Sequence, residues 1–281
     1  MKKVGLFDSG IGGFSILKDL MKLNPDMSFY YIADEAFLPY GEKSEEFIRE
    51  RCKKVVEVLM EKKVDLVVVA CNTATAFGIQ SLRERFCDVP FVGVEPYLNI
   101  VNQGEEPSSR RLAALITPST KISPRFLKLK KRVDPEGEIS IFDCKNLASI
   151  VEEFYSKGNG RELEKKLRLE LGPLKGSGFT HVILGCTHYP LVQSFIEKEL
   201  DCQCISPGPY VAKRVKHLLE ELTLEGTEPI AESAENSTFQ FLSTKSGAWA
   251  SRKFSDFGIF WMGKRTIGRR NGKRSLDFIR D

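Results

Sequence analysis

The sequence has no long hydrophobic run. None of the uninterrupted apolar stretches in its 281 residues exceeds seven residues, even when glycine is counted as apolar. A helix that crosses a membrane needs about 20 consecutive apolar residues, so we expect no such helix. Residues 1–5 lead directly into a strand-like segment, without the apolar stretch and cleavage site of a signal peptide. These features predict a cytoplasmic protein without a membrane segment.

Nucleotide and metal motifs are also missing. The glycine-rich residues 10–13 do not end in the Gly-Lys-Ser/Thr of a phosphate-binding loop and lack the spacing of a dinucleotide fingerprint. Cys202 and Cys204 form a C-x-C pair, but no second pair of cysteine or histidine residues lies nearby, so we interpret both as structural thiols. The sequence therefore predicts neither a metal nor an organic cofactor.

Cysteine is present in an odd number, seven, in a chain that is 42% hydrophobic and 28% charged. These proportions exclude a largely disordered chain. An odd number of cysteines in a chain of this size argues against a disulfide framework and is typical of a protein kept reduced in the cytoplasm.

The net charge of +4 is concentrated at the C-terminus. Residues 263–281 carry seven basic and two acidic side chains, so the rest of the chain is close to neutral. Such a tail is either solvated or contacts nucleic acid, an anionic surface or a partner protein. The sequence leaves both alternatives open.

Strand-like and helix-like segments alternate along the chain. Residues 64–71 are apolar without alternation, which is typical of a central parallel strand covered on both faces. Ser44 is suited to cap one helix, and Asn72 and Thr73 are suited to cap the next. We expect strands at 3–8, 28–34, 64–71, 91–94, 112–116, 139–144, 181–186 and 239–242, and helices at 14–23, 45–60, 74–86, 146–156, 161–171, 190–200 and 209–222, with one more beginning at 124.

The second half of the chain repeats the plan of the first. Each half opens with a strand that leads into a hydroxyl-bearing loop, and each later has an apolar strand that ends in a cysteine, Cys71 or Cys186. This pattern predicts an α/β fold of two pseudo-symmetric, doubly wound parallel-sheet domains that face each other across a central cleft. We expect one domain to comprise residues 1–97 and 206–281, and the other residues 98–205.

The two cysteines at the strand ends suggest proton transfer. A thiol before a helix N-terminus is expected to have a pKa below its usual 8.5, so Cys71 and Cys186 could each act as base and as acid. On opposite walls of one cleft, such a pair could remove a proton from one face of a carbon atom and deliver one to the other. The alternative is that each cysteine is a small buried hydrophobic residue.

Four short strings resemble the glutamate racemase family. They are VGLFDSGIGG at residues 4–13, PYG at 39–41, ACNTA at 70–74 and LGCTHYPL at 184–191, within a match that runs from residue 4 to about 215. The resemblance implies cofactor-independent interconversion of L- and D-glutamate, which supplies D-glutamate for peptidoglycan synthesis. It also implies that Cys71 and Cys186 are the acid/base thiols, with Asp8 assisting the first and His188 and Glu152 assisting the second.

The same resemblance implies which residues contact the substrate. The binding residues would be Asp8, Ser9, Tyr40, Gly41, Asn72, Thr73, Thr187 and His188. From the residues alone, more ordinary roles stay open: Asn72, Thr73 and Thr187 as helix caps, Asp8 as a turn residue and His188 as a core residue.

The chain departs from the family pattern at two positions and leaves other functions open. Ser119 stands where the family has glycine, and Ser206 stands near a usual aspartate. Family members also imply a homodimer, and some bind DNA gyrase. The alternatives are an aspartate or broad-specificity racemase, or a non-catalytic regulator that contacts DNA or gyrase through the basic tail.

Overall fold

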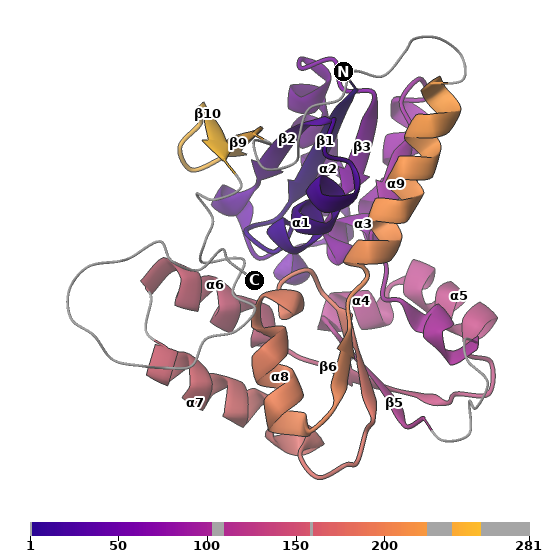
Figure 1. The fold of residues 1–281 in the computed structure, drawn as a ribbon, viewed down its shortest axis with the longest axis vertical. Helices are drawn as coiled ribbons and strands as arrows, with labels where there is room; N and C mark the ends of the chain where they lie inside the picture. The colour runs from indigo at the N-terminus through magenta and orange to yellow at the C-terminus, as the bar shows by residue number, and fades with distance from the viewer. Residues whose placement is uncertain (1, 103–109, 158–159, 224–237, 254–281) are drawn as a thin grey trace.

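The chain folds around two β-sheets, which lie in the upper and lower parts of Figure 1. The structure is a computed structural model that describes residues 2–102, 110–157, 160–223 and 238–253. The basic tail lies outside these residues, so the expectation for its contacts stays a prediction.

The first sheet has the strand order β10-β9-β2-β1-β3-β4. All its strand pairs are parallel except β9 with β10. The strands are β1 (Lys3–Asp8), β2 (Ser28–Ala33), β3 (Leu66–Val69), β4 (Phe91–Gly93), β9 (Thr238–Ser243) and β10 (Trp249–Lys253). Because β9 pairs with β2, residues 238–253 belong to the same sheet as the N-terminal strands.

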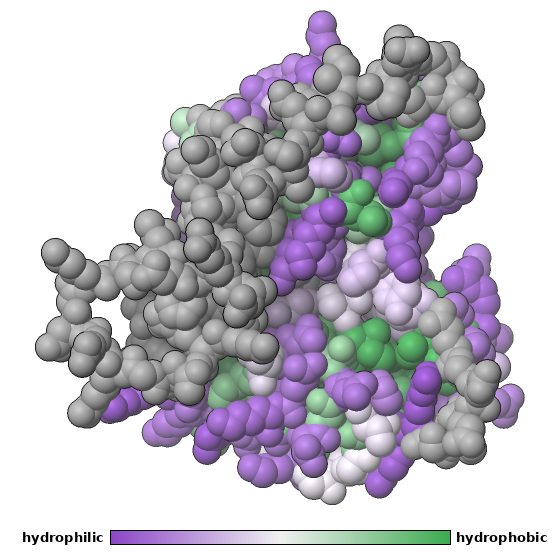
Figure 2. All heavy atoms as spheres, in the orientation of Figure 1, coloured by the Kyte–Doolittle hydropathy of each residue, from purple (hydrophilic) through white to green (hydrophobic). Residues whose placement is uncertain are grey.

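Helices cover both faces of this sheet. One buried cluster includes residues of α1 and α9, and another includes residues of α2 and α3. The elements are α1 (Phe14–Leu23), α2 (Glu45–Met60), α3 (Asn72–Arg85) and α9 (Gly208–Thr223), with the short 3-10 helices η1 (Glu35–Phe37), η2 (Tyr40–Glu42) and η3 (Leu98–Asn102). The apolar side of α9 packs on α1, and its outer surface is largely hydrophilic (Figure 2).

The second sheet has the strand order β6-β5-β7-β8, and all its pairs are parallel. Buried clusters again lie on both of its faces. Its elements are β5 (Leu112–Ile116), β6 (Ile139–Asp143), β7 (His181–Gly185), β8 (Gln203–Ile205), α4 (Pro118–Ile122), α5 (Pro124–Val133), α6 (Leu147–Lys157), α7 (Gly160–Leu171), η5 (Gly172–Leu174), η6 (Tyr189–Val192) and α8 (Gln193–Leu200).

The two sheets share one strand order at their centre. The run β2-β1-β3-β4 in the first sheet matches β6-β5-β7-β8 in the second, with the first strand of each half beside the strand that precedes a cysteine. This confirms the predicted fold class of two similar parallel α/β units. The short elements α4, β8 and β10 were not predicted, because three to five residues carry too little periodicity. The domain limits near 97 and 206 stay predictions.

Helix capping followed the predictions at one site and departed from them at another. Ser44 accepts a hydrogen bond from the Phe47 N–H at the start of α2, as predicted. The prediction that Asn72 and Thr73 cap the next helix is wrong, because Cys71 is the cap and its sulfur accepts from the Ala74 N–H. Asn72 and Thr73 thus lie in the first turn of α3, where their side chains face the site.

Among the described residues, no helix is long and apolar enough to cross a membrane.

Candidate functional site

One cavity of about 380 Å³ lies where the carboxyl ends of the two sheets meet. It is lined by residues that follow β1, β3, β5, β6 and β7, which is where parallel α/β sheets form ligand sites. The predicted site residues in its wall are Ser9, Tyr40, Gly41, Cys71, Asn72, Thr73, Glu152, Cys186, Thr187 and His188. The structure therefore brings together residues that lie far apart in the sequence.

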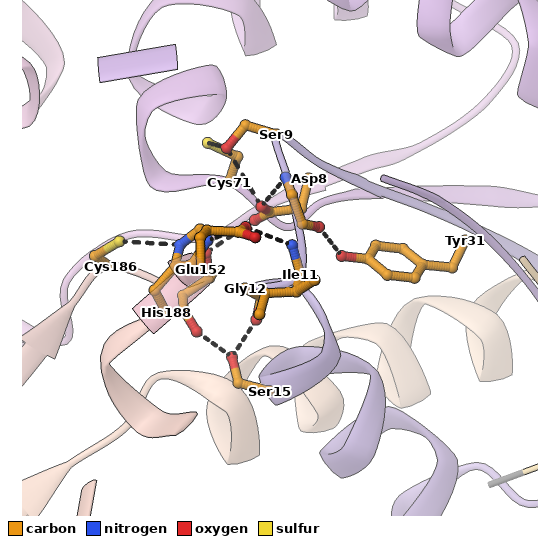
Figure 3. A network of polar contacts seen from close by, with 12 residues as sticks. Asp8, Ser9, Ile11, Gly12, Ser15, Tyr31, Cys71, Glu152, Cys186 and His188 are labelled. Atoms are coloured by element: carbon orange, nitrogen blue, oxygen red, sulfur yellow. Dashed lines mark hydrogen bonds and ion pairs between the residues drawn. The ribbon is translucent and has the colours of Figure 1, made fainter. Parts of the chain in front are cut away.

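Cys71 stands on the side of the cavity that belongs to the first sheet. It directly follows β3 and Ala70, beside the end of β1, because β1 and β3 are paired in parallel register. Its sulfur lies 3.9 Å from the Ser9 hydroxyl oxygen, which lies 3.4 Å from Oδ1 of Asp8. A short polar chain thus connects the thiol to a buried carboxyl group (Figure 3).

The surroundings of Cys71 keep its thiol protonated. Burial and the nearby Asp8 raise the pKa of Cys71 to about 12, against the opposing effect of the Ala74 N–H. The sequence-based prediction of a lowered pKa is therefore wrong for Cys71. The helix N-terminus supplies only one N–H to the sulfur, and this is outweighed by the loss of solvent and by a neighbouring acid.

Asp8 is fully buried and does not line the cavity directly. Its carboxylate accepts a hydrogen bond of 2.9 Å from the Gly10 N–H and one of 2.8 Å from the Thr187 hydroxyl, which belongs to the second sheet. Burial raises the pKa of Asp8 above its usual value, although His188 and these hydrogen bonds oppose the shift. Asp8 is therefore held from both halves of the molecule and can retain a proton more readily than an exposed aspartate.

Cys186 stands on the opposite side, directly after β7, and has different neighbours. Its sulfur lies 3.6 Å from Nδ1 of His188, and Nε2 of the same ring lies 2.7 Å from Oε1 of Glu152. Glu152, on α6, also accepts a 2.8 Å hydrogen bond from the Ile11 N–H in the loop after β1. Figure 3 shows these groups as a continuous line from the thiol to the first sheet.

The charges on His188 and Glu152 stabilise each other. Burial by itself lowers the pKa of His188, but Cys186 and Glu152 outweigh it and raise the pKa well above the usual value. Burial raises the pKa of Glu152, and the bonds from His188 and Ile11 reverse this and lower it. Between these two pKa values the histidine is an imidazolium and the glutamate is a carboxylate, so both ring nitrogens of His188 donate.

Polar groups also line the floor of the cavity. Asn72 is 4% exposed, and its Nδ2 donates to the Val94 carbonyl, but its Oδ1 has no partner within the described parts of the chain. The Thr73 hydroxyl lies 3.5 Å from the hydroxyls of both Thr117 and Ser119. The hydroxyl-bearing residues Thr73 and Thr117 line the cavity, so the wall is suited to a polar ligand.

Tyr40 lines the cavity, but its hydroxyl is bonded to another residue. The hydroxyl donates to Oδ2 of the buried Asp34 at 2.6 Å, and Arg51 binds the same carboxylate through two nitrogens at 2.7 and 2.6 Å. Asp34 and Arg51 were not among the predicted site residues. A signal existed, because Asp34 stands at the end of an apolar segment, as Asp8 does.

The glycines after Asp8 allow close packing against the second sheet. A Cβ atom on Gly12 would lie 2.5 Å from the Thr187 hydroxyl and 2.6 Å from Nδ1 of His188. No side chain fits there, so Gly12 is required for the approach of the two halves. Several cavity-lining residues that follow β5 and β6 were also not predicted, namely Thr117, Pro118, Cys144, Lys145, Asn146, Ala148 and Ser149.

The chain is similar in sequence to known racemases. Residues 20–215 match the family described as Asp/Glu/Hydantoin racemase. The glutamate racemase of Aliarcobacter butzleri is 37% identical over 228 residues, which cover 78% of this chain and 84% of that protein. The glutamate racemase of Pseudomonas paraeruginosa is 36% identical over 223 residues, which cover 79% of this chain and 83% of that protein.

Solved structures show the same similarity. The glutamate racemase of Escherichia coli, in complex with L-glutamate and the activator UDP-MurNAc-Ala, has a TM-score of 0.73 at 30% identity and covers 88% of this chain and 91% of its own. The glutamate racemase of Francisella tularensis, in complex with D-glutamate, has a TM-score of 0.71 at 28% identity and covers 86% of this chain and 88% of its own.

Proposed function

This chain belongs to the Asp/Glu/Hydantoin racemase family as one of its glutamate racemases, and we propose that Cys71 and Cys186 invert glutamate at Cα without a cofactor. The observation that carries the proposal is the placement of the two thiols. They follow equivalent strands of two different sheets and line the same cavity, each with its own proton-handling neighbours.

The reaction needs one proton removed and one added. The thiolate of one cysteine takes the proton from Cα, which breaks the C–H bond and leaves the electron pair on the substrate as a carbanion delocalised into the α-carboxylate. The thiol of the other cysteine then donates its proton to the opposite face of Cα. One thiolate is consumed and another is formed, so the step is balanced without an oxidant or reductant.

The polar groups of the cavity wall stabilise the negative charge of the substrate. Asn72 and Thr73 lie in the first turn of α3, whose N-terminus favours a carboxylate. Thr187 supplies a backbone on the opposite side. We assign Ser9, Tyr40 and Gly41 to the remaining carboxylate, with Tyr40 contributing its backbone.

Each thiol has its own neighbouring groups that assist proton transfer. Asp8 assists Cys71 through the Ser9 hydroxyl, and His188 assists Cys186 with Glu152 holding its ring. The His188 ring can exchange a proton with the Cys186 sulfur, which lies 3.6 Å from Nδ1. On the other side, the protonated Cys71 is ready to donate.

The biological setting follows from the reaction. We propose that the enzyme works in the reducing cytoplasm, because an oxidised Cys71 or Cys186 could not carry a proton, and that its D-glutamate supplies peptidoglycan synthesis. We also propose that the chain forms a homodimer, which light scattering on the purified protein would measure directly.

Circular dichroism with purified protein tests the proposal. We expect the optical signal of either D- or L-glutamate to decay to zero, and the product formed in deuterated water to carry deuterium at Cα. The same assay with D-aspartate tests the narrower specificity. A stable signal with glutamate would refute the function, and racemised product without deuterium at Cα would refute the mechanism.

A further inference from the structure

Ser15 lies just outside the catalytic groups and bridges the two halves of the molecule. It is the second residue of α1, it is buried, and its hydroxyl oxygen lies 2.8 Å from the Gly12 carbonyl and 2.8 Å from the Thr187 carbonyl (Figure 3). The first contact is local, and the second reaches the turn between Cys186 and His188. Nothing in the reaction proposed above uses this residue.

The Thr187 carbonyl needs a donor from outside its own turn. In the sequence Thr187-His188-Tyr189-Pro190, the residue that would donate to it in a tight turn is Pro190, which has no N–H. The next N–H, of Leu191, donates to the His188 carbonyl instead. Thr187 is 1% exposed, so solvent does not replace the missing donor.

The single proton of the Ser15 hydroxyl therefore goes to Thr187. A hydroxyl donates one hydrogen bond, and the Gly12 carbonyl already accepts from the Ser15 N–H at 3.0 Å. The Gly12 carbonyl thus accepts from the Ser15 backbone N–H, and the Thr187 carbonyl accepts from the Ser15 hydroxyl.

The position of this carbonyl decides where two functional side chains lie. Thr187 donates to Asp8 at 2.8 Å, and the next residue, His188, lies 3.6 Å from the Cys186 sulfur. The Gly12 backbone packs against both side chains with no room for a Cβ atom. Displacing this turn would therefore disturb Asp8 and His188 together.

From these contacts we infer that Ser15 is a positioning residue, which holds the Cys186–His188 turn against the Gly12 loop and so keeps both thiols aligned on one substrate carbon. This inference rests on the proposed function. It assigns a task to a helix residue that touches neither the cavity nor a thiol.

The test compares four full-length variants. Ser15→Ala removes the donor, Ser15→Cys replaces it with a weak donor of similar size, and Ser15→Thr keeps the hydroxyl. Ser123→Ala is the matched control, since Ser123 is also buried at a helix start and its hydroxyl also donates to the carbonyl three residues before it, but it lies outside the cavity wall.

We expect kcat to fall in the order wild type, Ser15→Thr, Ser15→Cys, Ser15→Ala, with a loss of roughly 10- to 100-fold for alanine and a much smaller change in KM. Ser123→Ala should lower the thermal midpoint without lowering kcat. Equal kcat values for wild type, Ser15→Cys and Ser15→Ala would overturn the inference. If Ser15→Ala does not fold, Ser15→Cys against wild type decides the question.

A second measurement is independent of turnover. Alkylation of Cys186 by iodoacetamide at neutral pH, followed by peptide mass spectrometry, should be slower in Ser15→Ala because the imidazole beside the sulfur is no longer held in place. The exposed Cys87 should react equally in all variants. Unchanged alkylation of Cys186 would count against the inference, whereas wild-type protein that does not racemise glutamate would refute the proposed function instead.

Discussion

Cys71 and Cys186 follow equivalent strands in two sheets of the same central order, yet the groups beside them differ. The first thiol faces a hydroxyl and a buried carboxyl group, and the second faces an imidazolium paired with a carboxylate. The first environment raises the pKa of Cys71 to about 12, and the second raises the pKa of His188 well above its usual value. The internal repeat therefore places the two thiols in equivalent positions, while their neighbours give them different partners for proton transfer.

This difference suits a reaction whose two directions are chemically equivalent. L- and D-glutamate have equal free energies, so kcat/KM must be the same in both directions, whatever the asymmetry of the site. In the proposed mechanism one thiol accepts a proton while the other donates one, and each thiol has its own neighbours for this exchange. Substitutions beside either thiol should therefore change individual steps, such as proton exchange at Cα, and the kcat measured in each direction.

Removal of either thiol should have the largest effect. We expect Cys71→Ala and Cys186→Ala each to lose racemisation by roughly 10³-fold or more, because inversion needs an acid and a base on opposite faces. Each variant should still exchange Cα–H for deuterium in one enantiomer, and the two variants should prefer opposite enantiomers. Nuclear magnetic resonance in deuterated water measures both quantities.

The control for these variants is Cys87→Ala, which removes an exposed cysteine away from the cavity and should leave kcat unchanged. Full racemase activity in Cys71→Ala or in Cys186→Ala would contradict a two-thiol mechanism.

Changes in the neighbours of the thiols should have intermediate effects. We expect Asp8→Asn and His188→Asn each to lower kcat by roughly 10²-fold, because the thiols remain but lose their proton partners. His188→Asn should slow deuterium exchange of the same enantiomer as Cys186→Ala, and Asp8→Asn that of the same enantiomer as Cys71→Ala.

Two matched variants separate these effects from general damage. His217→Asn changes an exposed histidine that pairs with Glu221 on α9, and Asp134→Asn changes a buried aspartate that accepts backbone N–H bonds away from the cavity. Both should keep kcat. If His188→Asn and Asp8→Asn slowed the same enantiomer, the assignment of one helper to each thiol would be wrong.

The smallest expected effect concerns stability at high pH. The folded state raises the pKa of Cys71 from its ordinary value of 9.0 to about 12, so above pH 9 the unfolded chain loses this proton while the folded chain keeps it. The free energy of unfolding should therefore fall with rising pH, by about 1.4 kcal/mol per pH unit from this group. Urea unfolding of wild type and Cys71→Ala between pH 9 and 10.5 measures the difference in slope.

Cys87→Ala again supplies the control and should show the wild-type slope. If Cys71→Ala also kept the wild-type slope, Cys71 would titrate alike in the folded and unfolded chains. The folded protein would then not raise the pKa of Cys71.

Much of the site was predictable because its residues stand in short, distinctive strings. Asp8 ends a recognisable apolar strand, Cys71 and Cys186 each come just after one, and parallel sheets gather such positions at one edge. Glu152 lies on a helix with an ordinary pattern, and only a resemblance indicated it. Asp34, Arg51 and Ser15 were missed, because their partners lie in other elements and no local periodicity marks such contacts.

The sequence by itself determined the alternation of strands and helices, the repeat of the two halves and the presence of a cysteine after an equivalent strand in each half, because hydrophobic period and strand-end motifs are local properties. Only the tertiary structure decided the proton states. The bonds Thr187 to Asp8, Ile11 to Glu152 and Ser15 to Thr187 join residues 179, 141 and 172 positions apart. Burial and charge at such junctions depend on how the sheets pack, which is why the pKa of Cys71 rises where its helix position alone predicted a fall.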